Sequence, residues 1–275
     1  MAMLLEHPEE GSVPFDPVPD AGRAAALHSP EPWTLLDLLF FVVFAFFTFV
    51  FTGIVALAGY AALRPVMGWT LPPRALGQNT FFLLGVQFAA YILIFAYIYL
   101  LVVYHYRFRF WEGIKWGHLN NGRILSYVGG GVLLTIAVQM AATLLPDKGT
   151  FPLEKMFSSQ DASYALAVFA VVIGPFMEEL IFRGVLFSIF ETRAGLAFAV
   201  LATAALFAAM HIPEYSGAWN HVFFIFLVGL ALSLTRGVTR SLAPCVILHV
   251  TYNGCLMIVL FFATSHFRVI QGALK

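Results

Sequence analysis

Long apolar runs dominate the sequence, at about residues 36–60, 81–104, 124–145, 162–182, 195–211, 220–235 and 242–263. A helix needs about 20 residues to cross the hydrocarbon core of a bilayer; these runs are long enough or nearly so, and the sixth is short. Within the runs, apolar residues occupy all sides of a helix and do not alternate as in a membrane β-barrel. The pattern predicts an all-α, polytopic transmembrane helix bundle of about seven or eight spans.

The composition supports this class. Hydrophobic residues make up 60% of the chain and charged residues 11%, whereas an ordinary soluble domain has about 25% charged residues. The net charge of zero leaves no long-range field that would recruit nucleic acid, so we expect a lipid bilayer and no nucleic acid as partners. Cys245 and Cys255 lack the spacing of metal ligands and are predicted to be packing residues.

The chain divides into a tail and a bundle. Residues 1–33 are rich in proline and acidic residues and lack the pattern of a secretory signal, so they are predicted to be a disordered cytoplasmic tail. Residues 34–275 are predicted to form one bundle domain. Lys and Arg, with Arg236 and Arg240 counted as loop residues, are slightly more frequent on the side of the tail, which favours a cytoplasmic N-terminus.

Ionisable residues inside spans cost about 2.5 kcal/mol or more each on insertion scales, so each needs a reason. The fourth run contains Glu178, Glu179 and Arg183. On a helix, Glu179 and Arg183 are four residues apart in the favourable order and can form a pair. Glu178 points about 100° away from this pair. Glu179 is therefore predicted to be structural and Glu178 to be available for chemistry.

Two later runs add further polar residues. His211 ends the fifth run after Phe207, which by itself indicates packing, and His249 and Asn253 share a helix face in the seventh run. At about 1.5 Å of rise per residue, Glu178, His211 and His249 lie roughly 18, 24 and 12 Å from the same membrane face. Given helix tilts of tens of degrees, these depths are compatible with one site.

The residue types suggest hydrolysis of an amide by one of two routes. Glu178, His211 and His249 could bind Zn²⁺ with an open fourth position, where the metal would activate water. Alternatively, Glu178 and a neutral histidine deprotonate water while the other histidine and Asn253 stabilise the oxyanion. Two other functions use similar clusters: a membrane transporter or proton-coupled relay, and a noncatalytic immunity or binding protein.

Three motifs occur in order within about residues 160–260: Glu178-Glu179-x-x-x-Arg183, Phe207-x-x-x-His211 and His249-x-x-x-Asn253. Together they resemble the motifs of the CAAX protease and bacteriocin-processing (CPBP, or Abi) family, which is related to the CAAX prenyl endopeptidases.

The resemblance implies an intramembrane endopeptidase of the bacterial inner membrane with a cavity facing the cytoplasm. In such an enzyme Glu178 and His211 would activate water, while His249 and Asn253 would lie on the oxyanion or metal side. Glu179, Arg183 and Phe207 would support them. The substrate would be a peptide or protein, including one with a lipidated C-terminus.

One smaller pattern concerns packing. Gly129, Gly130 and Gly131 follow one another in the third run. Small residues let transmembrane helices approach closely. A close helix contact is predicted at this position.

Overall fold

The computed structural model describes residues 33–145, 155–215 and 218–268, which all lie in one structural unit. Every regular element in these ranges is helical, and no strand occurs among them. The predicted all-α class is therefore confirmed. Residues 1–32 of the predicted tail lie outside the described residues, and Trp33, the last residue assigned to it, is buried.

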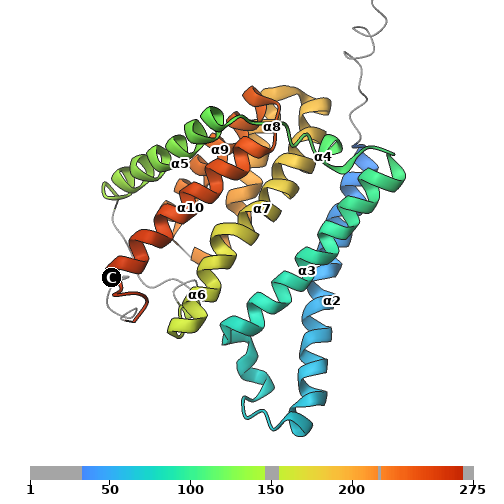
Figure 1. Cartoon of the computed structure of the whole chain (residues 1–275). Helices are drawn as coiled ribbons and strands as arrows, with labels where there is room; N and C mark the ends of the chain where they lie inside the picture. Colours follow the sequence, from blue (N-terminus) through green and yellow to red (C-terminus); the bar gives the residue numbers. More distant parts are fainter. Residues whose placement is uncertain (1–32, 146–154, 216–217, 269–275) are drawn as a thin grey trace, which may run out of the picture. The chain divides into compact units, whose positions relative to one another are not determined.

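Three long helices make up the first part of this unit (Figure 1). They and the short elements between them are α2 (Leu35–Met67), η1 (Pro73–Gln78), α3 (Thr80–Leu100), the π-helical turn η2 (Leu101–His105), α4 (Phe110–Gly113) and α5 (Asn121–Ala142). The helices α2 and α3 pack along each other, with the rings of Phe44 and Tyr97 stacked at 4.5 Å. Thr34 and Asp37 form a capping box that starts α2.

The second part contains an almost continuous helical segment followed by two more long helices. Its elements are α6 (Gln160–Val168), the π-helical segment η4 (Phe169–Ile173), α7 (Gly174–Glu179), the π-helical segment η5 (Leu180–Leu186), α8 (Phe187–Met210), the 3-10 helix η6 (Ile212–Tyr215), α9 (Trp219–Thr239) and α10 (Ala243–Ala263). Phe169 of η4 stacks on Tyr91 of α3 at 5.8 Å, which joins the two parts.

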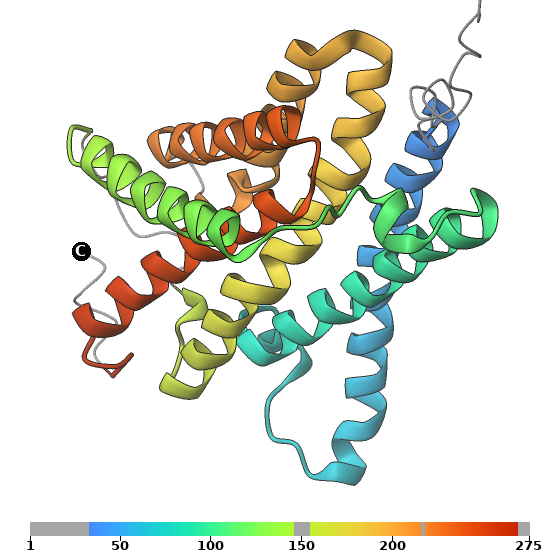
Figure 2. The same ribbon diagram turned by 45° about the horizontal axis from the view of Figure 1, so that its top comes forward.

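Six helices of the described residues are long and apolar enough to cross a membrane, and one of them, Gln160–Met210, has 51 residues. It is not straight, because Gly195 has φ 82° and ψ 173°. The chain turns back there (Figure 2), and the rings of Phe182 and Phe207 lie 5.3 Å apart. In a straight helix these residues would be about 37 Å apart. The two arms correspond to the predicted fourth and fifth spans.

The boundary predicted for the sixth run was wrong. The sixth run was predicted to end near residue 235, with Arg236 in a loop, but α9 continues to Thr239. Arg236 is fully buried, and its Nε donates to the backbone oxygen of Arg183 at 3.1 Å. A charged residue can remain inside a bundle helix when it has such a partner. Arg236 is therefore not a loop residue, and it does not count among the loop Lys and Arg residues that favour a cytoplasmic N-terminus.

The predicted close contact at the glycine run is present between α5 and α10. A Cβ atom added to Gly131 would lie 2.6 Å from Cβ of Thr251 and 2.8 Å from the backbone oxygen of Leu248. A Cβ added to Gly129 would meet no atom within 4 Å. Gly131 thus sets how near these two helices can lie, and Gly129 does not.

This contrast predicts opposite effects of the same substitution. Gly131→Ala should lower the free energy of unfolding by about 1–3 kcal/mol through overpacking. Gly129→Ala should leave it unchanged or raise it by up to about 1 kcal/mol, because alanine favours the helix. Thermal unfolding of both purified variants in the same detergent measures the difference. Equal unfolding temperatures would show that the helices can separate to accept the methyl group.

Candidate active site

The candidate site is built on the segment that contains Glu178 and Glu179. These two residues end α7, and π-helical segments precede and follow that short helix. Such wider turns occur frequently at functional sites. Here the backbone oxygen of Ala170, in the first of them, accepts a hydrogen bond of 2.8 Å from Nδ2 of Asn253. The bond ties α10 to this segment.

A buried ionic group lies at the centre of the site. Arg183 Nη1 lies 3.0 Å from Oε1 of Glu179, and both side chains are 0% exposed. The pair predicted from sequence spacing is therefore present. The same Oε1 accepts a second hydrogen bond of 2.8 Å from Nδ1 of His249 on α10. A buried carboxylate needs such partners, because burial without them is costly.

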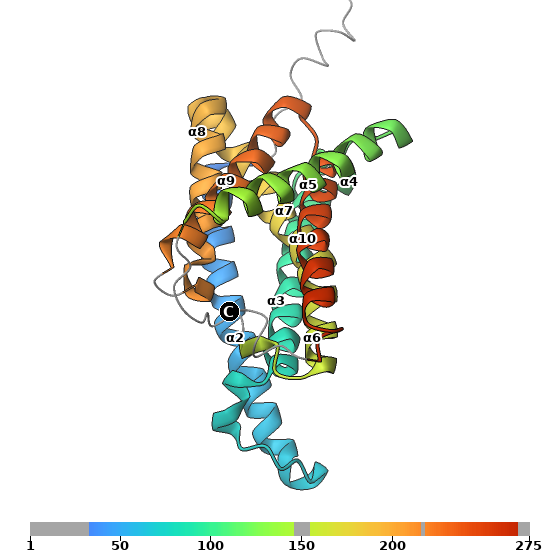
Figure 3. The same ribbon diagram turned by 90° about the vertical axis from the view of Figure 1, so that its left-hand side faces the viewer.

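The neighbouring helix α9 holds the other end of Arg183. Its Nη2 donates to the backbone oxygen of Gly229 at 2.8 Å and to Oγ of Ser233 at 3.4 Å. A Cβ added to Gly229 would lie 3.1 Å from the ring of Phe207, so α8 and α9 cross closely at this point. Figure 3 shows these two helices side by side. Sequence reasoning missed Gly229 and Ser233, which lie in an apolar run without a motif.

The contact to Glu179 determines the proton position on His249. Glu179 is an acceptor, so Nδ1 carries a hydrogen, and in the neutral ring Nε2 presents a lone pair. Nε2 lies 3.8 Å from Oε2 of Glu178. The Glu178 side chain is 21% exposed, whereas that of Glu179 is 0% exposed. Glu178 is thus the more accessible of the two adjacent glutamates, as predicted.

His211 has a similar arrangement at the end of α8. Its Nδ1 lies 2.8 Å from the backbone oxygen of Phe207. A carbonyl oxygen only accepts, so Nδ1 carries the hydrogen and Nε2 of the neutral ring is the basic nitrogen. The ring of Phe207 lies 4.8 Å from that of His211 and 5.7 Å from that of His249. The Arg183 guanidinium lies 4.7 Å from the same ring. Phe207 therefore touches three of the predicted site residues.

Glu214 is a further carboxylate near this group. It lies in η6, and its backbone N–H donates to the backbone oxygen of His211 at 3.1 Å. Burial raises the pKa of Glu214, the Glu178 carboxylate raises it further, and His211 opposes the shift. The sequence offered no motif for this residue. It brings an acidic group from another segment into the surroundings of Glu178.

The structure thus joins most of the predicted residues through α7, η5, the C-terminal end of α8 and α10. Glu178, Glu179, Arg183, Phe207, His211 and His249 form a chain of direct contacts. Asn253 lies one turn beyond His249 and makes its hydrogen bond to Ala170 rather than to this chain. The catalytic roles predicted for these residues stay predictions.

The donor set tests whether the site suits a metal ion. In residues 33–145, 155–215 and 218–268, no three His, Cys, Asp or Glu side chains gather as a group that could hold one. Nδ1 of His249 donates to Glu179 and Nδ1 of His211 donates to a backbone oxygen, which is the usual arrangement of histidines that bind a metal through Nε2. The two histidines are thus oriented as zinc ligands would be, but Glu178, His211 and His249 are not gathered as a metal-binding group in this arrangement. Zinc stays a prediction.

Comparison with known proteins gives a family match for the segment that contains the three motifs. Residues 160–255 match the family described as type II CAAX prenyl endopeptidase Rce1-like. No curated protein and no solved structure matches the chain. The matched range contains all three motifs and the contacts described above. The match covers about a third of the chain and supports the resemblance of its three motifs to the CAAX protease and bacteriocin-processing family.

Proposed function

We propose that the protein is an intramembrane endopeptidase in which Glu178 activates the attacking water without a metal ion. The observation that carries this proposal is the placement of the partly exposed Glu178 beside Nε2 of His249, whose ring is fixed from behind by Glu179. A carboxylate that water can reach, next to an oriented imidazole, is suited to general acid–base chemistry. The family match supports hydrolysis of a peptide bond.

In the proposed reaction, Glu178 removes a proton from water as the water oxygen attacks the scissile carbonyl carbon. His211 can accept the second hydrogen of this water at Nε2. The carbonyl oxygen takes on negative charge in the tetrahedral intermediate, which then loses its C–N bond. The proton held by Glu178 passes to the nitrogen of the leaving amine, so the carboxylate is restored.

Two groups on α10 are suited to the developing oxyanion. Asn253 uses Nδ2 for Ala170, and a side-chain amide has a second hydrogen to donate. His249 can donate from Nε2 when its ring carries both protons, and Glu179 then supplies the compensating negative charge. Donors that are already oriented stabilise such a charge without reorganisation. This division of roles agrees with the assignment expected from motif position.

We further propose that the substrate is a peptide or protein that approaches from the cytoplasmic side of a bacterial inner membrane. A lipidated C-terminus fits a site that lies among membrane-spanning helices, because the lipid would remain in the bilayer while the peptide bond reaches Glu178. The motif resemblance and the family match support this substrate class.

Incubation of the purified protein with quenched peptides that carry either a farnesylated or an unmodified cysteine a few residues before the C-terminus tests the proposal. A preparation from cells that lack the gene controls for contaminating proteases. We expect a C-terminal fragment to be released only by the protein, and an equal rate after treatment with a strong chelator. Loss of activity with the chelator, restored by zinc, would contradict the metal-free route. Substrate flux across sealed vesicles without any peptide product would favour a transporter.

A further inference from the structure

A pocket far from Glu178 in the sequence lies where α2 ends and α3 begins. It has a volume of about 570 Å³ and is lined by Tyr60, Gly68, Trp69, Thr70, Leu71, Leu76, Asn79, Phe81 and Phe82. A second hollow of about 640 Å³ shares Gly68, Trp69 and Thr70 with it and adds Arg64. The two hollows meet around Trp69. Nothing in the proposed peptide hydrolysis uses them.

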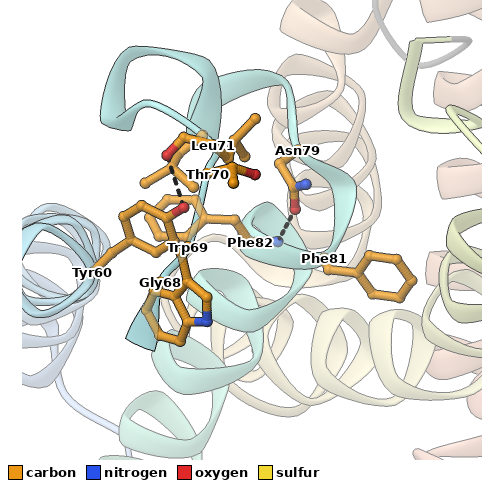
Figure 4. Close-up of a pocket in the computed structure, with 9 residues that line it drawn as sticks. Tyr60, Gly68, Trp69, Thr70, Leu71, Asn79, Phe81 and Phe82 are labelled. Carbon is orange, nitrogen blue, oxygen red and sulfur yellow. Dashed lines mark hydrogen bonds between the residues drawn. The ribbon is translucent and has the colours of Figure 1, made fainter. Parts of the chain in front are cut away.

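The pocket walls are held in place by local contacts (Figure 4). The rings of Tyr60 and Trp69 stack at 4.9 Å, and the Tyr60 hydroxyl donates to the backbone oxygen of Leu71 at 2.9 Å. The Asn79 side chain accepts a hydrogen bond from the backbone N–H of Phe82 and so caps α3. These contacts fix both the aromatic wall and the polar edge, so the hollow is preformed.

Arg64 contributes a positive charge in a fixed position. Its Nε donates to the backbone oxygen of Trp69 at 3.1 Å, and its Nη2 donates to that of Thr70 at 3.3 Å. Its third nitrogen, Nη1, has no hydrogen-bond partner within the part of the chain that the structure describes. The guanidinium is thus oriented by two backbone groups and retains donor capacity for an anion.

The pocket also lies at the expected depth of a membrane surface. Val66 and Met67, in the last turn of the apolar helix α2, are 81% and 59% exposed. Such apolar side chains in a membrane protein face lipid. Within the next residues the chain presents Trp69 beside Arg64, and Trp and Tyr side chains concentrate at the level of lipid headgroups. A phosphate group here would meet a guanidinium, while Phe81 offers apolar surface to acyl chains.

We propose that the two hollows around Trp69 together bind the phosphate-bearing headgroup of a membrane phospholipid, with Arg64, which lines the second hollow, as the anion ligand and Trp69 as the aromatic wall. Arg forms strong, charge-assisted hydrogen bonds to phosphate. Basic pockets between transmembrane helices bind lipid headgroups. The proposal concerns lipid binding only and does not depend on the proposed peptidase reaction.

Native mass spectrometry of the full chain in detergent, titrated with a short-chain phosphatidylglycerol, tests the proposal. Arg64→Gln should weaken binding about tenfold, which corresponds to the loss of one hydrogen bond to a charged group. Arg74→Gln is the matched control, because Arg74 is exposed in the adjacent η1 but lines neither hollow. An equal loss in both variants would overturn the assignment to Arg64.

Two comparisons on the unmodified protein identify the ligand without any variant. A diacylglycerol of the same chain length lacks the phosphate and should not be retained at concentrations where phosphatidylglycerol is. Equal retention of the two lipids would overturn the proposal. Millimolar inorganic phosphate should leave phosphatidylglycerol bound, because it lacks the apolar contacts. Complete displacement by phosphate would assign the pocket to the free anion and overturn the lipid assignment.

Discussion

Replacing Glu178 by Gln should slow peptide hydrolysis by the purified protein about 100- to 10,000-fold, the usual contribution of a general base. The amide keeps the size of the side chain but cannot accept the proton of the attacking water. The fold should remain intact, because the Glu178 side chain is partly exposed and its nearest ionic contact, to His249, is as long as 3.8 Å. The buried pair of Glu179 and Arg183 is untouched by this change.

Glu112→Gln provides the matched control for this experiment. Glu112 lies in α4, its side chain is 64% exposed, and its ion pair with Arg109 is at the surface. Initial rates on one cleavable peptide and thermal unfolding should be measured for the unmodified protein and both variants. A Glu178→Gln protein that unfolds normally and retains full activity would disprove the proposed role of Glu178.

The sequence was sufficient for those features that depend on neighbours along one helix. Span positions follow from the length of apolar runs, and the contact between Glu179 and Arg183 follows from their four-residue spacing. The greater accessibility of Glu178 follows from the same geometry, because one step along a helix turns a side chain by about 100°. These predictions hold although π-helical segments precede and follow α7, because the motif residues remain near each other.

Contacts between helices could not be predicted in this way. The bond from His249 to Glu179 joins residues 70 positions apart, and the bond from Arg183 to Gly229 joins residues 46 apart. Spacing along one helix contains no information on which helices are neighbours. The end of α9 was misplaced for the same reason, because the partner that allows Arg236 to be buried lies on another segment.

A large loss of stability is expected when the buried ion pair of Glu179 and Arg183 is broken. Arg183→Met should reduce the free energy of unfolding by about 3–5 kcal/mol, because it leaves the Glu179 carboxylate buried without its compensating charge. The bond from His249 remains but does not replace the lost cation. Unfolding of the detergent-solubilised protein by a denaturing detergent measures the loss. Arg109→Met is the control, since the Arg109 side chain is 87% exposed and its removal should change stability little.

A double variant separates the charge effect from the loss of packing by the Arg183 side chain. Glu179→Gln combined with Arg183→Met removes both charges, and the Gln oxygen can still accept from Nδ1 of His249. Replacing a whole buried ion pair by neutral groups is often tolerated, so the double variant should recover most of the stability that Arg183→Met loses. If it is as unstable as the single variant, the bonds of Arg183 to Gly229 and Ser233 matter more than its charge. Hydrolysis by a stable double variant would then report how far the positioning of His249 depends on a charged Glu179.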